Sequence, residues 1–98
     1  MTITKKQNGE ALELLLEGRL DTTTAPELEK ELGSALQGVK ALTLDCEGLE
    51  YISSAGLRVL LAAQKIMSCQ GELKIKNVNE TIMEIFEVTG FSDILTIE

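Results

Sequence analysis

Residues 49–61 read LEYISSAGLRVLL, and this stretch sets where a central helix of the chain begins. Two hydroxyl residues, Ser53 and Ser54, follow an apolar pair and precede a run with strong helical character. The first backbone N–H groups of a helix have no partner inside it and carry the positive end of its dipole. A serine there either caps the helix or carries a phosphate, so the stretch predicts a helix start suited to an anion or a phosphoryl group.

The predicted helix is apolar on more than one stripe. From Ala55 to Ala63 its only charged side chain is Arg58. One interpretation is that this apolar surface docks a protein partner beside the serine hydroxyls. The other is that neighbouring elements enclose the helix in the core, and that a serine does no more than cap it. The residues alone leave both interpretations open.

The composition is that of one small domain. A chain of 98 residues with 44% hydrophobic and 26% charged residues can form a single core. No apolar stretch reaches the ~18 residues of a membrane span. No secretory signal follows the first lysines, so we expect a cytoplasmic protein without membrane insertion. The net charge of −7 repels a phosphate backbone, which argues against nucleic acid and favours a protein as partner.

The chain lacks the residues that several classes of enzyme need. The chain has no histidine, which removes the commonest metal ligand and the commonest general base. Cys46 and Cys69 match no zinc or redox spacing, and we expect both to be small buried residues. The serines lack the first glycine of a nucleophile elbow, and residues 33–40 miss the phosphate-loop pattern by one position. We therefore expect no catalytic residue, no metal and no cofactor.

Helices and strands are expected to alternate after an opening hairpin. The Asn8-Gly9 pair between two apolar runs predicts a tight turn between antiparallel strands, the second of which spans 11–17. The later expected elements are helices at 24–38, 54–70 and 80–89 and strands at 41–46, 73–76 and 94–97. Because helical crossovers join parallel strands, the order predicts an α/β fold with a mixed, mostly parallel sheet.

A second polar segment, Asp21-Thr22-Thr23-Thr24, follows the hairpin. Its plain interpretation is turn and cap chemistry, because Thr24 and Glu27 have the form of a capping box. If the loops meet at one edge of the sheet, Asp21 faces Ser54, and Asp45 lies near that edge at the end of its strand. Two carboxylates and a hydroxyl suit Mg²⁺ and phosphoryl chemistry, so weak nucleotide binding there is one hypothesis.

Three segments, in this order, resemble the bacterial anti-sigma factor antagonists of the STAS domain family. Residues 17–25 are similar to the family's G-x-L-D-x-x-(T/S)-A entry into its first helix. Residues 44–57 are similar to its central strand and phosphorylation loop, and residues 86–91 to the end of its third helix. The resemblance implies that residues 1–98 form a single STAS domain, with a four- or five-strand mixed sheet and three helices packed largely on one face.

The resemblance also implies a function by partner switching. In that family the unmodified antagonist binds an anti-sigma factor that is also a serine kinase, and so frees the sigma factor. Phosphorylation of the antagonist ends the complex, and a serine phosphatase restores it. The motif aligns Ser54 with the phosphoacceptor, and Ser53, which stands where the family commonly has aspartate, is a second candidate acceptor. The chain itself would be no enzyme, since the catalytic groups lie on its partners.

The implied partner-binding surface combines the polar loop with the start of the central helix. Its expected members are Asp21, Thr22, Thr23, Ser53, Ala55, Gly56, Leu57 and Arg58. Related STAS chains also serve in transport or stress-signalling complexes, and some of those chains are never phosphorylated. A non-phosphorylated adaptor is therefore the second hypothesis, beside the weak nucleotide-binding module.

Overall fold

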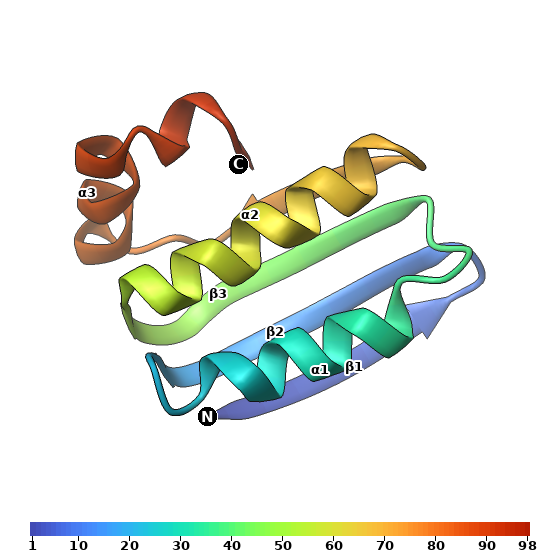
Figure 1. Cartoon of the computed structure of the whole chain (residues 1–98), viewed down its shortest axis with the longest axis horizontal. Helices are drawn as coiled ribbons and strands as arrows, with labels where there is room; N and C mark the ends of the chain where they lie inside the picture. The colour runs from blue at the N-terminus through green and yellow to red at the C-terminus, as the bar shows by residue number, and fades with distance from the viewer.

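The computed structural model describes residues 1–98, which form three α-helices around one face of a five-stranded sheet (Figure 1). In chain order the elements are β1 (Thr2–Asn8), β2 (Ala11–Leu20), α1 (Ala25–Ala35), β3 (Ala41–Ile52), α2 (Ser54–Ser68), β4 (Glu72–Lys76), α3 (Glu80–Thr89), the 3-10 turn η1 (Phe91–Asp93) and β5 (Thr96–Ile97). The strands are adjacent in the order β1-β2-β3-β4-β5, so β1 and β5 form the two edges. Only β1 is antiparallel to its neighbour, which confirms the mixed, mostly parallel sheet.

The opening hairpin forms where the Asn-Gly pair predicts it. Asn8 is opposite Ala11, and Thr2 is opposite Glu17 at the far end of the pair. Gly9 has a φ of 63°, a left-handed conformation that glycine adopts without a steric penalty.

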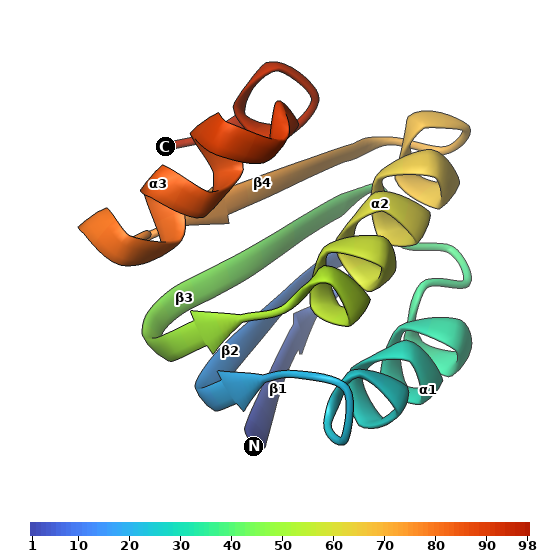
Figure 2. The same cartoon turned by 60° about the vertical axis from the view of Figure 1, so that its left-hand side comes forward.

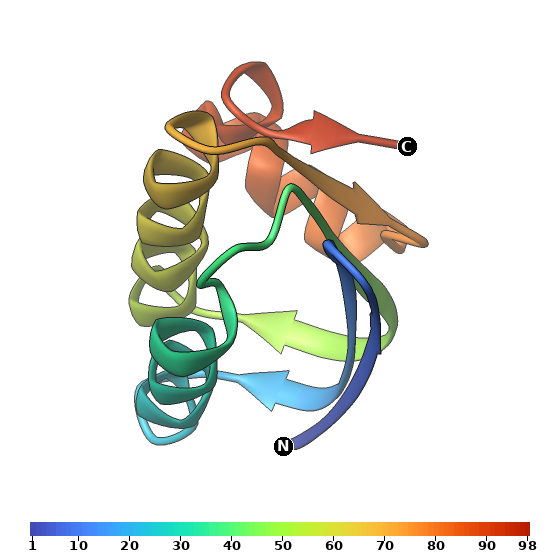
Figure 3. The same cartoon turned by 90° about the vertical axis from the view of Figure 1, so that its right-hand side faces the viewer.

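One hydrophobic core lies between the sheet and the helices. Along β2, Leu12, Leu14 and Leu16 alternate inward, as the period of a strand requires. Helices α1 and α2 lie side by side over the curled sheet, and α3 packs against β3 and adds Ile82 and Phe86 to the same core (Figure 3). The expectation of three helices packed largely on one face is confirmed.

The opposite face of the sheet carries paired charges. The Nζ atom of Lys76 on β4 lies 2.7 Å from a carboxylate oxygen of Glu13 on β2, and Lys74 pairs with Glu98 at 3.3 Å. Each such pair contributes little to stability because both partners are partly exposed. The pairs do show that this face is polar.

Strands β2 and β3 are longer than the sequence pattern predicts. We expected them to end near residues 17 and 46, but β2 continues to Leu20 and β3 to Ile52. Shifts of register between Leu15 and Glu17, and again between Gly18 and Arg19, interrupt the alternation of buried and exposed positions. Each bulge inserts an extra residue, so the alternation of apolar and polar residues that identifies a strand in the sequence is lost beyond it. The expectation of a loop between residue 46 and the central helix is therefore wrong for residues 47–52, and only Ser53 lies between β3 and α2.

Three smaller expectations are also corrected. Helix α1 ends at Ala35 and does not reach Gly38, and the turn η1 shortens the last strand to Thr96–Ile97. Cys46 is buried as expected, but Cys69 is exposed at the end of α2. No helix of the chain combines the length and the apolarity needed to cross a bilayer.

Candidate functional site

The polar loop and the start of α2 meet at one end of the molecule (Figure 2). Leu20 at the end of β2 is in register with Ile52 at the end of β3. The N–H of Ser53 extends this pairing by donating to the carbonyl of Leu20 at 2.9 Å. Because both strands leave the sheet at this point, the exposed side chains of residues 21–24 and 53–58 lie close together at one surface, called here the entry site.

The two serines have different environments. Ser53 is the N-cap of α2, with extended backbone, and its Oγ accepts a long hydrogen bond of 3.4 Å from the N–H of Gly56. Ser54 is the first residue of the helix and is exposed, and its hydroxyl takes part in no hydrogen bond. The capping function that the sequence allowed for either serine therefore belongs to Ser53, and the Ser54 hydroxyl is free.

The polar loop folds around the Asp21 carboxylate. Oδ1 of Asp21 accepts hydrogen bonds from the Thr23 hydroxyl at 2.7 Å and from the N–H groups of Thr23 and Thr24 at 3.0 and 3.2 Å. The Thr23 hydroxyl has the largest effect on the pKa of Asp21, and together with the two N–H groups it holds this pKa below its usual value against the opposing effect of burial. The loop therefore presents a fixed negative charge at the entry site.

Thr24 does not form the predicted capping box. Its backbone is helical and its side chain makes no cap hydrogen bond. The hydroxyl instead donates to the carbonyl of Arg19 at 2.7 Å and accepts from the N–H of Asp21 at 2.8 Å. Thr24 thus links the end of β2 to the loop. Hydroxyl side chains commonly form such local hydrogen bonds to the backbone in place of a helix cap.

Arg19 and Tyr51 form a stacked pair beside the loop that the sequence did not reveal. The guanidinium carbon of Arg19 lies 4.5 Å from the centre of the Tyr51 ring, and Nε of Arg19 lies 3.7 Å from Oδ2 of Asp21. The two residues are in register on β2 and β3. Only that register, which depends on the two bulges, brings them together, so no sequence signal identifies the pair.

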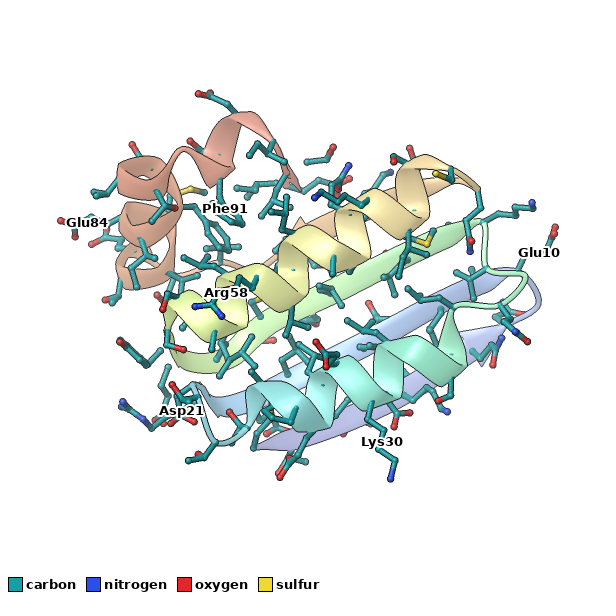
Figure 4. The ribbon with its side chains drawn as sticks, viewed as in Figure 1. Glu10, Asp21, Lys30, Arg58, Glu84 and Phe91 are labelled. Atoms are coloured by element: carbon teal, nitrogen blue, oxygen red, sulfur yellow. The ribbon has the colours of Figure 1, made fainter.

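A shallow groove of about 200 Å³ runs from the entry site between α1 and α2. Thr22, Ala55 and Arg58 line it from the predicted partner-binding set. The remaining lining residues are Ala25, Pro26, Glu29 and Val59. Figure 4 shows Asp21 and Arg58 at the same end of the molecule. The structure thus brings the polar loop, the free serine and one arginine onto a single exposed rim.

Two of the expected partner-binding residues are buried and are corrected here. Leu57 is 7% exposed and belongs to the core, and Gly56 is buried against the ends of β2 and β3. A Cβ atom at Gly56 would lie 2.7 Å from Leu20 and 2.9 Å from Ile52. Both residues therefore position the start of α2, and neither has surface to offer to a partner.

Asp45 does not lie at the entry site. It is in register with Leu15, so five residues of β2, or roughly 17 Å, separate it from the end of that strand at Leu20. Its carboxylate accepts from Asn77 and from the N–H of Glu47, both at 3.0 Å. No group of three or more acidic or cysteine side chains is arranged to hold a metal ion. The pair of carboxylates on which the nucleotide-binding hypothesis depended is therefore absent from this edge.

Comparison with known proteins gives this fold and site a family. The family model described as Mlab, STAS domain, matches residues 3–96. The chain is 39% identical over 84 residues to BtrV of Bordetella bronchiseptica. This match covers 84% of this chain and 72% of BtrV. It is 30% identical over 93 residues to the anti-sigma-B factor antagonist of Bacillus subtilis, with 94% and 85% of the two chains covered.

Solved structures share the fold at lower identity. The anti-sigma factor antagonist SpoIIAA in its unphosphorylated form superposes with a TM-score of 0.77 at 16% identity, covering 99% of this chain and 87% of SpoIIAA. The phosphorylated form of the same Bacillus protein gives 0.77 at 17% identity, with 99% and 91% covered. The chain belongs to the STAS domain family. Within that family, the relatives and structural neighbours named here include anti-sigma factor antagonists.

Proposed function

We propose that this protein is an anti-sigma factor antagonist that works by partner switching. The unmodified form binds an anti-sigma factor with serine kinase activity and thereby frees a sigma factor. The observation that carries the proposal is the Ser54 hydroxyl, which is exposed, takes part in no hydrogen bond and stands at the first position of α2. The family match and the relatives named as antagonists support it.

Ser54 is the phosphoacceptor in this proposal. Its Oγ attacks the γ-phosphorus of ATP held by the kinase, the bond from that phosphorus to the β,γ-bridging oxygen breaks, and ADP leaves. The hydroxyl proton passes to a base of the kinase, because the entry site has no histidine and its Asp21 carboxylate is occupied by Thr23 and Thr24. A serine phosphatase then hydrolyses the phosphoserine and restores the binding form.

The phosphate ends binding by direct obstruction. It adds about −1.5 to −2 charges at a surface that already holds Asp21. In a closed interface this charge is desolvated, and a hundredfold loss of affinity needs only about 2.7 kcal/mol. In the free protein the charge lies at an exposed helix start, where it is tolerated. SpoIIAA superposes on this chain with the same TM-score in both phosphorylation states, which supports a switch without refolding.

The test is capture of a kinase from lysate of the source cell by wild type, Ser54→Ala, Ser54→Asp and Ser53→Asp, followed by phosphosite mapping after addition of ATP. We expect wild type and Ser54→Ala to retain a protein with a kinase domain and Ser54→Asp to release it. Ser53→Asp is the matched control, because aspartate is also a preferred N-cap residue and keeps the fold. Equal capture by all four, with no phosphate on Ser54, would instead establish the non-phosphorylated adaptor.

A further inference from the structure

Arg58 has no structural partner in the protein. None of the ion pairs includes it: they join Lys5 to Glu31, Arg19 to Asp21, Lys74 to Glu72 and Glu98, and Lys76 to Glu13. Its side chain is exposed and makes no hydrogen bond. Stability of the fold therefore gives no reason for a cation at this position.

The position of Arg58 relative to Ser54 does give a reason. The two residues are four apart on α2, so they lie on the same face one turn apart, with about 5–6 Å between their Cβ atoms. Side chains on a helix lean toward its N-terminus, which directs a long residue at position 58 back over the first turn. The guanidinium can therefore reach a group attached to Ser54 Oγ.

The other charges around the site leave this role to Arg58. Glu29 from α1 lines the groove and Asp21 belongs to the polar loop at the entry site, and both carboxylates repel an added phosphate. Arg19 stacks on Tyr51 and pairs with Asp21, so its charge is already engaged. No other cation lines the groove.

We propose that Arg58 is a positioning residue that holds the phosphate of phosphorylated Ser54, with its guanidinium donating hydrogen bonds to two phosphate oxygens. The inference rests on the proposed phosphorylation of Ser54 and adds to it a residue that holds the phosphate in place. Arginine suits this role because its planar donor pair matches two phosphate oxygens and remains charged at any physiological pH. The clamp keeps the phosphate against α2 in the free protein and offsets the repulsion from Asp21 and Glu29.

The experiment uses protein in which phosphoserine is incorporated at position 54 during translation, so that it needs no kinase. The second ionisation of the phosphate is followed by ³¹P NMR in otherwise wild-type protein, in Arg58→Ala, in Arg58→Lys and in Lys65→Ala. Lys65→Ala is the matched control because it removes one positive charge from the last turn of the same helix. Far-UV circular dichroism and thermal melting verify that all four are folded.

We expect the phosphate pKa to be about 0.5 or more higher in Arg58→Ala than in the otherwise wild-type phosphoprotein, since a cation bonded to the dianion favours its ionisation. Arg58→Lys should fall between them and Lys65→Ala should match wild type. The Nε–H signal of Arg58 should also move on phosphorylation. Equal phosphate pKa values in wild type and Arg58→Ala would overturn the clamp. That result would leave partner switching itself standing, because the capture experiment tests partner switching separately.

Discussion

Leu20 leaves no room for a side chain at Gly56. A Cβ atom built on Gly56 would lie 2.7 Å from Cγ of Leu20, and Leu20 is fully buried. The start of α2 can therefore approach the ends of β2 and β3 this closely only because residue 56 is glycine. The placement of Ser53 and Ser54 at the rim depends on that approach.

Gly56→Ala should destabilise the protein. Alanine is a better helix former than glycine by about 1 kcal/mol, but overpacking against two buried side chains costs about 1–3 kcal/mol. We expect the clash to win, with a net loss of about 1 kcal/mol in urea unfolding and a fall in Tm of about 4–8 °C. Gly33→Ala in α1 is the control, because a Cβ there meets nothing within 4 Å. It should be neutral or stabilising; stabilisation by both changes would contradict the packing.

Ser53→Ala and Ser54→Ala should separate the cap from the free hydroxyl. Loss of the Ser53 cap costs about 0.5–1 kcal/mol, at the low end of the usual range because the hydrogen bond to Gly56 is long. Ser54→Ala should leave the free energy of unfolding within about 0.5 kcal/mol of wild type, since its hydroxyl has no partner. Urea titration of the two variants side by side measures both. A larger loss in Ser54→Ala would assign the cap to Ser54.

The difference between the serines was not available from the sequence, although much of the fold was. Alternating and helical apolar patterns predicted the hairpin, β4 and α3, and α3 has the predicted bounds Glu80–Thr89. The first half of β3 was predicted too, but its second half escaped because bulges break the alternation after Cys46. That error misplaced Asp45 at the functional edge, and it also hid the stacking of Arg19 on Tyr51. Residue type predicted where the site lies, but the register decided which side chains take part in it.

Asp45 should titrate below the usual range of a carboxyl group. Burial raises its pKa, but hydrogen bonds from Asn77 and the N–H of Glu47, with the charges of Lys76 and Lys6, together lower it further. The carboxylate therefore stabilises the fold above its unfolded-state pKa of about 3.9, and this contribution is lost as the pH falls through the lower folded-state pKa.

Asn77→Gly tests this assignment, because glycine accepts the left-handed φ of 60° at position 77 while removing the amide donor. Titration of the Asp45 carboxyl carbon by ¹³C NMR should show a higher pKa in the variant. The variant should also lose less stability than wild type when the pH is lowered from 5 to 2. An unchanged titration of Asp45 would show that the Asn77 hydrogen bond does not control it.

The two cysteines should react at very different rates. Burial, helped by the charge of Asp45, raises the pKa of the Cys46 thiol to about 12, so little thiolate forms at neutral pH. Cys69 is exposed at the end of α2. With a disulfide reagent that releases an absorbing thiolate when it reacts with a thiol, we expect one equivalent of thiol per chain to react rapidly in native protein and two in urea. Cys69→Ser should abolish the rapid equivalent, and a rapid equivalent that persisted in this variant would show that Cys46 is accessible.

The outer edge of β1 is built in a way that disfavours pairing with a second copy of the protein. An edge strand exposes unpaired N–H and C=O groups that can template the strand of another molecule. Here β1 is seven residues long, and Lys5 and Lys6 lie in its interior. If two such edges paired antiparallel about their centres, the Lys5 side chains of the two copies would lie directly opposite each other, which is unfavourable. The same strand that completes the sheet therefore disfavours extension of that sheet by a second molecule.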